Sequence, residues 1–345
     1  MSSTAENAAP LAPPAEVPEI LRGDWLDLPS DDPVAEYASQ MLWDNPEQPA
    51  SWMTARLSGA AFVYKEASSH WGFVAKFFLV KAGASAHKYA TREWRCTRRA
   101  TSTRIDQADG RVVRPLGIWR GVLFLEYVPG LRLEDVIAIR HSQPGRLAAS
   151  LERAARFLAS LHVGTAQPHS RPQFGASVRY AHGVVRQLAE HGILQANPIA
   201  MDGITRLIDQ WATTQAMTDF VPVLTHGDTT TTNFLFPERG GVVVVDWERL
   251  NLGDPAFDLG RLMAELTHSI KRHGGTIVEA EPFVHRLAEA YRQALPAGWD
   301  GQALVDRARF YRASSTLRIA RNGWVSRLDR TALVVQAMAL LAYAF

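Results

Sequence analysis

The chain has 345 residues, enough for two lobes around a cleft, because a single hydrophobic core stops growing below this size. Its composition is ordinary for a globular protein, and a formal net charge of +2 is too small to predict a nucleic-acid or membrane partner. A single cysteine excludes a disulfide framework within the chain and argues against a cysteine-based zinc site.

The two ends of the chain carry no targeting or membrane signal. Residues 1–20 are rich in Ala, Pro and Glu and lack the basic start and apolar core of a signal peptide, so we expect a disordered tail. The apolar stretch from Thr331 to Phe345 is shorter than the roughly 18 residues that a membrane span needs, and it predicts a buried helix. These features predict a cytoplasmic protein.

The first third of the chain predicts a sheet with one long helix. After a helix expected at 32–41, short stretches rich in Val and Phe are separated by Gly and polar turns, which is typical of strands. These stretches are residues 57–66, 72–80, 110–119 and 121–128. Residues 87–99, between the second and third stretches, are long and charged enough for a helix. We therefore predict an N-terminal lobe over residues 21–127.

The rest of the chain is predominantly helical. Apolar residues recur every three or four positions in 131–139 and 145–162, and further helices are expected to begin near Ala256, Glu281, Gln302 and Arg327. The exception is a small β region from Val221 to Asp246. The predicted fold class is α+β in two lobes, with residues 128–345 forming the larger helical lobe, the catalytic loop and the substrate site. This order of elements is the outline of a kinase.

The strongest motif is Thr-His-Gly-Asp-Thr-Thr-Thr-Thr-Asn at residues 225–233, with Asp246 at the end of four valines thirteen positions later. Phosphoryl transfer needs an acceptor oriented in line and metal ions that neutralise the triphosphate. Mg²⁺ prefers oxygen ligands and keeps several waters, so one or two side chains suffice. Asp228, Asn233 and Asp246 offer such oxygens, and an aspartate that leaves a buried strand is costly without metal or hydrogen bonds.

The pattern HGDxxxxN, an apolar strand, then DWE and GDPAFDL, resembles the aminoglycoside phosphotransferase and choline kinase family of the protein-kinase-like superfamily. The resemblance implies a protein-kinase-like fold in which Asp228 is the catalytic base. It implies that Asn233 and Asp246 hold Mg²⁺, with Glu248 assisting the metal or binding substrate. It assigns structural support of the catalytic loop to His226, Asp254 and Asp258.

The N-terminal lobe supplies candidate nucleotide-binding residues. Lys76 lies among apolar neighbours in an expected strand, and this type of lysine contacts the α- and β-phosphates and pairs with a helix glutamate. Glu93, 17 residues later in the expected helix, is the predicted partner. Lys65 and Lys81 compete for the role, but each flanks a turn.

Two further segments complete the predicted nucleotide site. Ser58 and Gly59 are the candidate phosphate loop, although one glycine makes a plain hairpin turn an almost equal interpretation. The segment with Glu126 and Val128 joins the lobes in the resembled family, where its backbone holds the purine. Because backbone atoms hold the purine, the side chains need not select the base, and the sequence does not distinguish ATP from GTP as the nucleotide.

The chain departs from the family in its catalytic loop and its C-terminal charge. Four threonines replace the more usual Leu and Pro, which predicts a loop shaped by hydroxyl hydrogen bonds, with Thr229 or Thr230 able to touch the acceptor. Residues 261–345 contain 12 Lys and Arg against 7 Asp and Glu, a balance of +5. This balance favours a neutral or anionic acceptor over a polycation.

The C-terminal arginines have two interpretations. They are residues 307, 309, 312, 318 and 321. One interpretation is a functional patch that binds an acceptor. The other is a solvated face, or pairing with acids such as Asp306 and Asp329. Both stay open at this point.

The function predicted is an ATP-dependent, or GTP-dependent, O-phosphotransferase that uses Mg²⁺ and moves the γ-phosphoryl to a small-molecule hydroxyl. Alternatives are a kinase of a sugar, nucleoside or amino alcohol, and a non-catalytic nucleotide-binding regulatory protein. No nucleic-acid or membrane partner is expected. The sequence leaves the acceptor, the nucleotide and the oligomeric state open.

Overall fold

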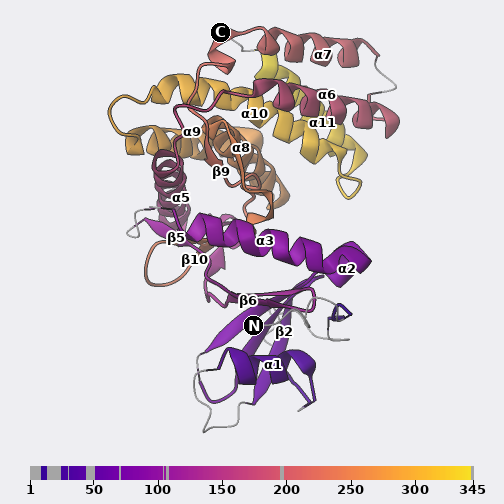
Figure 1. Ribbon diagram of the computed structural model, residues 1–345. Coiled ribbons are helices and arrows are strands. Elements are labelled where there is room, and N and C mark those ends of the chain that lie inside the picture. Colours follow the sequence, from indigo (N-terminus) through magenta and orange to yellow (C-terminus); the bar gives the residue numbers. More distant parts are fainter. Residues whose placement is uncertain are drawn as a thin grey trace. The chain divides into compact units, whose positions relative to one another are not determined.

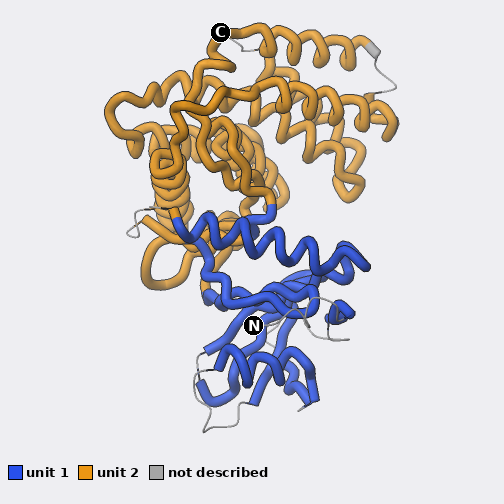
Figure 2. The backbone as a smooth tube through the Cα atoms, viewed as in Figure 1, with its two compact units in different colours: residues 1–102, 112–129, 246–248 blue, residues 103–111, 130–245, 249–345 orange. Residues whose placement is uncertain are grey.

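The computed structural model describes residues 9–13, 25–29, 31–43, 51–69, 71–103, 105, 109–194 and 198–342. Most of the predicted tail at residues 1–20 lies outside the described residues, so its disorder stays a prediction. The chain divides into two compact units, shown in Figure 2. The smaller unit is residues 1–102, 112–129 and 246–248, and the larger unit is residues 103–111, 130–245 and 249–345. The assignment of a nucleotide-binding and a substrate-binding lobe to 21–127 and 128–345 stays a prediction.

The smaller unit is built on a six-stranded sheet in which the neighbouring strands run antiparallel. The strands, in the order in which they pair, are β1 (Leu26–Asp27), β2 (Trp52–Ser58), β3 (Ala61–Glu66), β4 (Gly72–Phe77), β7 (Val122–Glu126) and β6 (Pro115–Trp119). Each of the four stretches predicted as strands contributes to this sheet, but the stretch predicted at 110–119 is divided, because its first residues form a strand of another sheet. The stretch predicted at 57–66 is the end of β2, a turn and β3, because β2 already begins at Trp52.

Side-chain alternation along β4 divides the two faces of this sheet. Phe73, Ala75 and Phe77 are buried on one face in a core that helix α1 (Pro33–Met41) covers. Lys76 points to the other face, along which helix α3 (Ala86–Thr101) lies (Figure 1). Short helices α2 (Leu79–Ala82) and η2 (Gly83–Ser85) connect β4 to α3.

The larger unit is mainly helical. Its helices are α4 (Leu133–Ala138), α5 (Pro144–Gly164), α6 (Phe174–Glu190), α7 (Pro198–Ala212), η3 (Gln215–Met217), α8 (Pro255–Arg272), α9 (Ile277–Ala294), α10 (Gly301–Arg321) and α11 (Arg327–Ala342), with η4 (Trp247–Arg249) at the unit boundary. Helix α9 begins four residues before the predicted Glu281, because the side chain of Thr276 accepts the Glu279 N–H at 3.1 Å and caps the helix there.

The described residues contain two further, smaller sheets. One contains β5 (Gly110–Val112), β11 (Val242–Val244), β10 (Phe234–Phe236) and β8 (Leu131–Arg132), and the other pairs β9 (Val223–Thr225) with β12 (Asn251–Gly253). Strands β9, β10 and β11 correspond to the β region predicted from Val221 to Asp246, whereas β5, β8 and β12 come from outside it. The predicted α+β class, with a β-rich N-terminal part and a larger helical part, is confirmed.

Helix α8 is the central helix of the larger unit, and most of its side chains are buried. A Cβ on Gly260 would lie 2.4 Å from the Ala308 carbonyl oxygen, so glycine allows α8 to pack closely against α10. The apolar C-terminal stretch forms α11, which buries Leu333, Val334 and Leu341. None of the helices in the described part of the chain is long and apolar enough to cross a membrane.

Candidate active site

The predicted catalytic loop connects β9 to β10 and contains His226, Gly227 and Asp228. Gly227 has a φ of +79°, and a Cβ there would lie 2.3 Å from the backbone oxygen of Arg249. Both the backbone conformation and the lack of space require glycine at this position. The turn places the side chain of Asp228 at the end of a buried strand, with 15% of it exposed to solvent.

Asp258, in the first turn of α8, holds this loop by accepting hydrogen bonds from two of its backbone amides. Its Oδ2 accepts the His226 N–H at 2.6 Å, and its Oδ1 accepts the Gly227 N–H at 3.0 Å. The His162 ring also lies 3.1 Å from Oδ2. Burial alone would raise the pKa of Asp258, but the hydrogen bond and charge of His162, with the Gly227 amide, hold it below its ordinary value. An ionised Asp258 therefore accepts from both amides.

His226 connects two segments of the larger unit. Its Nδ1 accepts the Asp228 N–H at 3.1 Å, so this nitrogen carries no proton. Its Nε2 then donates to the Val245 carbonyl at 2.9 Å. The ring holds the loop next to the end of β11, an arrangement compatible with the structural role predicted for His226.

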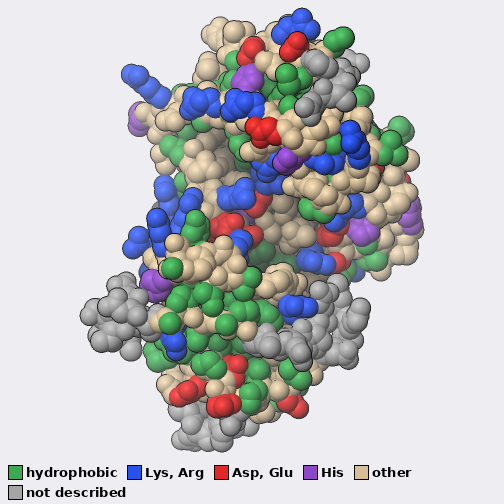
Figure 3. Space-filling model, turned by 90° about the vertical axis from the view of Figure 1, so that its right-hand side faces the viewer, with side chains coloured by type: hydrophobic (Ala, Val, Ile, Leu, Met, Phe, Trp, Pro, Cys, Tyr) green, Lys and Arg blue, Asp and Glu red, His purple; other side chains and the backbone are tan. Residues whose placement is uncertain are grey.

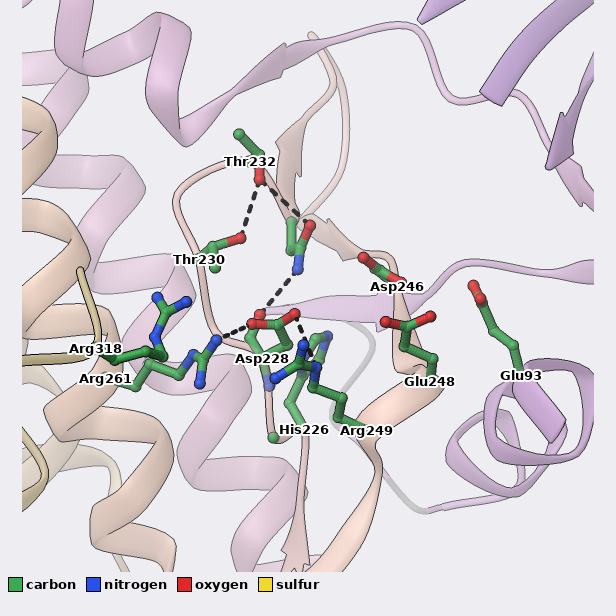
Figure 4. Close-up of polar contacts among 12 residues, drawn as sticks. Glu93, His226, Asp228, Thr230, Thr232, Asp246, Glu248, Arg249, Arg261 and Arg318 are labelled. Carbon is green, nitrogen blue, oxygen red and sulfur yellow. Dashed lines mark hydrogen bonds and ion pairs between the residues drawn. The ribbon is translucent and has the colours of Figure 1, made fainter. Parts of the chain in front are cut away.

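Hydroxyl hydrogen bonds shape the four-threonine segment, as predicted. Thr229 donates to the backbone oxygen of Asp258 at 2.7 Å, and Thr230 and Thr232 lie 3.0 Å apart (Figure 4). Thr231 donates to Glu134 at 2.5 Å. Side-chain hydrogen bonds thus replace the rigidity that the family more often obtains from proline.

Glu134, in the first turn of α4, is a partner of the loop that the sequence did not predict. Besides Thr231, it accepts Ser269 at 2.7 Å and His273 at 2.8 Å, and it forms an ion pair with Arg272. Burial raises the pKa of Glu134, but the hydrogen bonds from Thr231, Ser269 and His273 outweigh burial and lower it. No sequence signal links Glu134 to a loop almost one hundred residues away.

Asn233 ends the loop with its amide held in one orientation. Its Nδ2 donates to the backbone oxygen of Asp228 at 2.8 Å, and its own backbone oxygen accepts the Val245 N–H at 3.0 Å. The amide Oδ1 receives only a long contact, 3.5 Å, from Thr232. Asn233 therefore presents an oxygen of the kind that Mg²⁺ binds.

Two arginines lie against the carboxylate of Asp228, and neither was predicted as a site residue. Arg261 forms an ion pair with Oδ1, and the Nε of Arg249 lies 3.4 Å from Oδ2. Figure 4 shows both guanidinium groups directed at Asp228. One sequence signal could have indicated Arg261: it follows Asp258 by three residues, so the two side chains lie on the same side of α8.

The smaller unit brings together the predicted Lys76 and Glu93. Lys76 Nζ lies 2.7 Å from Glu93 Oε2 and 2.7 Å from Asp246 Oδ1. Burial lowers the pKa of Lys76, but the two carboxylates outweigh burial and hold it above its ordinary value. Burial raises the pKa of Glu93 to about 7, against the opposing effect of Lys76. Lys81, which competed with Lys76 for the phosphate-binding role, forms an ion pair with Glu248 at 3.1 Å instead.

Three carboxylates of the smaller unit form a group with the chemistry of a metal site. Glu93, Asp246 and Glu248 each offer an oxygen within 4.8 Å of the others (Figure 4). Asp246 has a φ of +66°, a strained conformation for a residue other than glycine. Strain of this kind is concentrated at functional sites, and carboxylate oxygens are ligands that suit Mg²⁺.

The remaining predicted nucleotide residues lie on the same sheet. Ser58 ends β2, and Gly59 begins the turn to β3, where Ala61 pairs with Lys76 across the sheet. A Cβ on Gly59 would meet nothing within 4 Å, so the turn is open. Glu126 ends β7, where its side chain accepts the Arg114 N–H at 2.6 Å, and Val128 follows the strand.

The C-terminal arginines do not form the free patch that one interpretation proposed. Arg307 pairs with Asp254 at 3.1 Å, where Asp254 also caps α8 through the Ala256 N–H. The other pairs are Arg309 with Asp306, Arg312 with Glu281, Arg318 with Glu265 and Arg321 with Gln187. On the face drawn in Figure 3, Lys and Arg side chains lie in several separate groups. The alternative interpretation, pairing with acids, describes these arginines better.

The family comparison decides the class of protein. A model of the phosphotransferase enzyme family matches residues 52–304. The chain belongs to this family. The sequence-based prediction of a small-molecule kinase is therefore confirmed at the level of the family. No match to the chain is found among curated proteins.

Solved structures share the fold of this family member at low sequence identity. The ADP-bound aminoglycoside phosphotransferase APH(2'')-Ib is 13% identical with a TM-score of 0.54, covering 91% of this chain and 99% of that one. The gentamicin complex of APH(2'')-IIa is 14% identical with a TM-score of 0.55, covering 92% and 97%. An ethanolamine kinase from Plasmodium vivax is 12% identical with a TM-score of 0.56, covering 94% and 92%. The predicted protein-kinase-like fold is confirmed.

Proposed function

We propose that the chain transfers the γ-phosphoryl of ATP, or of GTP, to a hydroxyl of a small molecule, with Asp228 as the catalytic base. The observation that carries this proposal is the construction of the loop around Asp228. Backbone amides of His226 and Gly227 are held by Asp258, and Asn233 is held by the Asp228 carbonyl. A loop with so many fixed groups around a partly exposed carboxylate suits a reaction that depends on positioning.

Asp228 acts on the acceptor. As the acceptor oxygen forms its bond to the γ-phosphorus, the bond between that phosphorus and the bridging oxygen of the nucleotide breaks. The hydroxyl proton passes to the Asp228 carboxylate, and the nucleoside diphosphate leaves with the electron pair of the broken bond. Arg261 and Arg249 hold the carboxylate in its orientation before the acceptor arrives.

The smaller unit binds the nucleotide in this proposal. Lys76, oriented by Glu93, contacts the α- and β-phosphates. The open turn at Ser58 and Gly59 offers backbone amides and a hydroxyl to a phosphate, and the backbone of Glu126 and Val128 binds the purine. The ADP bound to the similar APH(2'')-Ib structure supports a nucleotide site on this fold.

Asn233 and Asp246 are the proposed Mg²⁺ ligands. The Asn233 Oδ1 is oriented by the bond of its own amide nitrogen, and Asp246 belongs to a group of carboxylates. When bound, the metal neutralises charge on the phosphate oxygens. Glu248 stands beside Asp246 as a further oxygen donor. We place the reaction in the cytoplasm, where nucleotide triphosphates and Mg²⁺ are abundant.

The proposal is tested by incubating the protein with γ-labelled ATP or GTP, Mg²⁺ and a panel of hydroxyl compounds. The panel contains aminoglycosides, sugars, nucleosides, amino alcohols and phosphorylated or carboxylated polyols. We expect label to move to at least one class of acceptor and not to water alone. A protein that binds neither nucleotide, and transfers no label to any class, contradicts the proposal. A protein that binds nucleotide without transfer favours the regulatory alternative.

A further inference from the structure

Tyr291, His162 and Asp258 form a line of polar side chains in the larger unit. They come from α9, α5 and α8, three helices that pack against one another. The Tyr291 hydroxyl lies 2.7 Å from Nδ1 of His162, and Nε2 of the same ring lies 3.1 Å from Oδ2 of Asp258. All three side chains are completely buried. Buried polar groups depend on hydrogen bonds to one another, so this line is sensitive to the loss of any member.

The line ends at the backbone of the proposed catalytic loop. Asp258 accepts the His226 N–H through Oδ2 and the Gly227 N–H through Oδ1. The hydrogen bond with His162 opposes rotation of this carboxylate away from the two amides. Gly227 immediately precedes Asp228, so a turn of the Asp258 carboxylate would displace the proposed base. Displacements of about 1 Å can cost a positioned reaction a factor of about 100.

The hydrogens of this line have one arrangement that leaves no donor unpaired. Burial, followed by the charges of Asp258 and Asp254, raises the pKa of Tyr291 well above its ordinary value, so the hydroxyl keeps its proton. Its acceptor among the described residues is Nδ1 of His162. The ring hydrogen is then on Nε2, where it donates to the Asp258 carboxylate.

A hydrogen on Nδ1 would disrupt this arrangement. The Tyr291 hydroxyl hydrogen would then have no acceptor in the part of the chain that the structure describes, and an unpaired buried donor costs free energy. If that were the only ring hydrogen, the lone pair of Nε2 would also face the Asp258 carboxylate. The Tyr291 hydroxyl therefore favours the form of His162 that supports Asp258.

We propose that Tyr291 and His162 are positioning residues of the phosphotransferase reaction, which hold Asp258, and through it the loop that carries Asp228, in the catalytic conformation. This inference rests on the proposed function, because it assigns the two side chains to that reaction. In the described part of the chain their side-chain hydrogen bonds are to each other and to Asp258. They act on the base through Asp258 and not by contact with a substrate.

The first test measures the position of the ring hydrogen and needs no acceptor. Wild-type protein is labelled with ¹⁵N in its histidines, and NMR separates protonated from unprotonated ring nitrogens. The His162 signals are those absent from His162→Gln and displaced in Tyr291→Phe. We expect a proton on Nε2 and none on Nδ1. A proton on Nδ1 of wild-type His162 overturns the proposal.

The second test measures transfer and nucleotide binding together. Tyr291→Phe keeps the ring, whose centroid lies 5.8 Å from that of His162, and removes only the hydroxyl. With Mg²⁺, nucleotide and the acceptor that the panel selects, we expect kcat to fall about tenfold. Affinity for Mg²⁺ and a non-hydrolysable ATP analogue should stay within about twofold of wild type. An unchanged kcat contradicts the proposal.

A double-mutant cycle tests whether Tyr291 acts through His162. His162→Gln retains a side-chain N–H that can reach Asp258, whereas His162→Leu retains none, so we expect glutamine to keep more of kcat than leucine. An amide N–H needs no partner to fix its tautomer. Adding Tyr291→Phe to His162→Gln should therefore lower kcat by less than about twofold. A further tenfold loss would show that Tyr291 acts independently of His162.

The matched control is Tyr311→Phe, which removes a hydroxyl that is also buried but bonds to Asp254 and Ser177. We expect this variant to lose stability and to keep kcat within about twofold of wild type. Equal losses of kcat in Tyr291→Phe and Tyr311→Phe would reduce the effect to fold stability and overturn the positioning role. If wild type transfers label to no acceptor, the proposed function fails instead, and the NMR measurement still decides the tautomer.

Discussion

A carboxylate in the first turn of α4 holds one part of the proposed catalytic loop. Glu134 receives the hydroxyls of Thr231 and Ser269 and the side chains of Arg272 and His273. At the scale of residues, the site is therefore a set of fixed acceptors around a short loop. Asp258 performs the same function for the amides of His226 and Gly227.

The hydrogen bond between Thr231 and Glu134 predicts a positioning role for one hydroxyl. Thr231→Val keeps the shape of the side chain and removes its hydrogen bond, so we expect kcat to fall about tenfold while nucleotide KM changes little. Thr231→Ser restores the hydroxyl and should restore most of kcat. Thr232→Val, at an exposed neighbour, is the matched control. Equal kcat values for Thr231→Val and wild type would exclude a positioning role for the bond.

The pair Lys76 and Glu93 predicts a pH dependence of nucleotide binding. Burial raises the pKa of Glu93 to about 7, so this carboxyl takes up a proton as pH falls through that value and loses the negative charge that orients Lys76. We expect KM for ATP to rise as pH falls below about 7. The variant Glu93→Gln should have a high KM for ATP that does not rise further as pH falls below about 7. If KM for ATP rises at low pH in the variant as it does in wild type, the titrating group is not Glu93.

At the scale of elements, α8 is the helix that organises the larger unit. It begins at the Asp254 cap, presents Asp258 and Arg261 to the loop, and is buried along most of its length. Sequence reasoning could find this helix, because Gly-Asp-Pro marks a capped start with proline in the first turn. It could not find the contacts of Arg261, because they depend on which side of the helix the loop meets.

Helix α8 also carries a histidine that limits acid stability. His268 is nearly buried beside Trp324, and burial, then the charges of Arg272 and Lys271, lower its pKa to about 4. Its folded pKa lies below the unfolded value, so the stabilisation is complete above about pH 6.5 and is lost as pH falls towards 4.

The variant His268→Phe should remove this part of the acid sensitivity. At about pH 5, we expect wild type to have lost about 2 kcal/mol of unfolding free energy through His268, relative to pH 7. The variant should lose correspondingly less over the same interval, while other groups contribute equally to both proteins. Urea unfolding at the two pH values measures the difference. Identical losses in both proteins would show that His268 does not titrate in this range.

At the scale of the whole molecule, the sequence predicted the class of the fold, and it named the candidate site residues, whose roles stay a prediction. Strand alternation and local motifs carried these predictions, since Lys76, Asp228 and Asn233 sit in short recognisable patterns. Glu134 and the arginines at Asp228 were missed, because they reach the loop from distant segments. Contacts of that kind depend on packing and leave no local pattern.

The proposed division of roles between the units makes one measurement decisive. The proposed nucleotide residues lie in the smaller unit and Asp228 lies in the larger one. The variant Asp228→Asn keeps the size of the side chain and removes the base. Nucleotide affinity and phosphoryl transfer should be measured together on this variant and on wild type.

We predict that Asp228→Asn binds Mg²⁺ and ATP within about twofold of wild type and loses transfer by at least about a thousandfold. This result would separate binding from chemistry and assign the base to Asp228. Transfer at the wild-type rate in a variant that binds nucleotide normally would contradict the account.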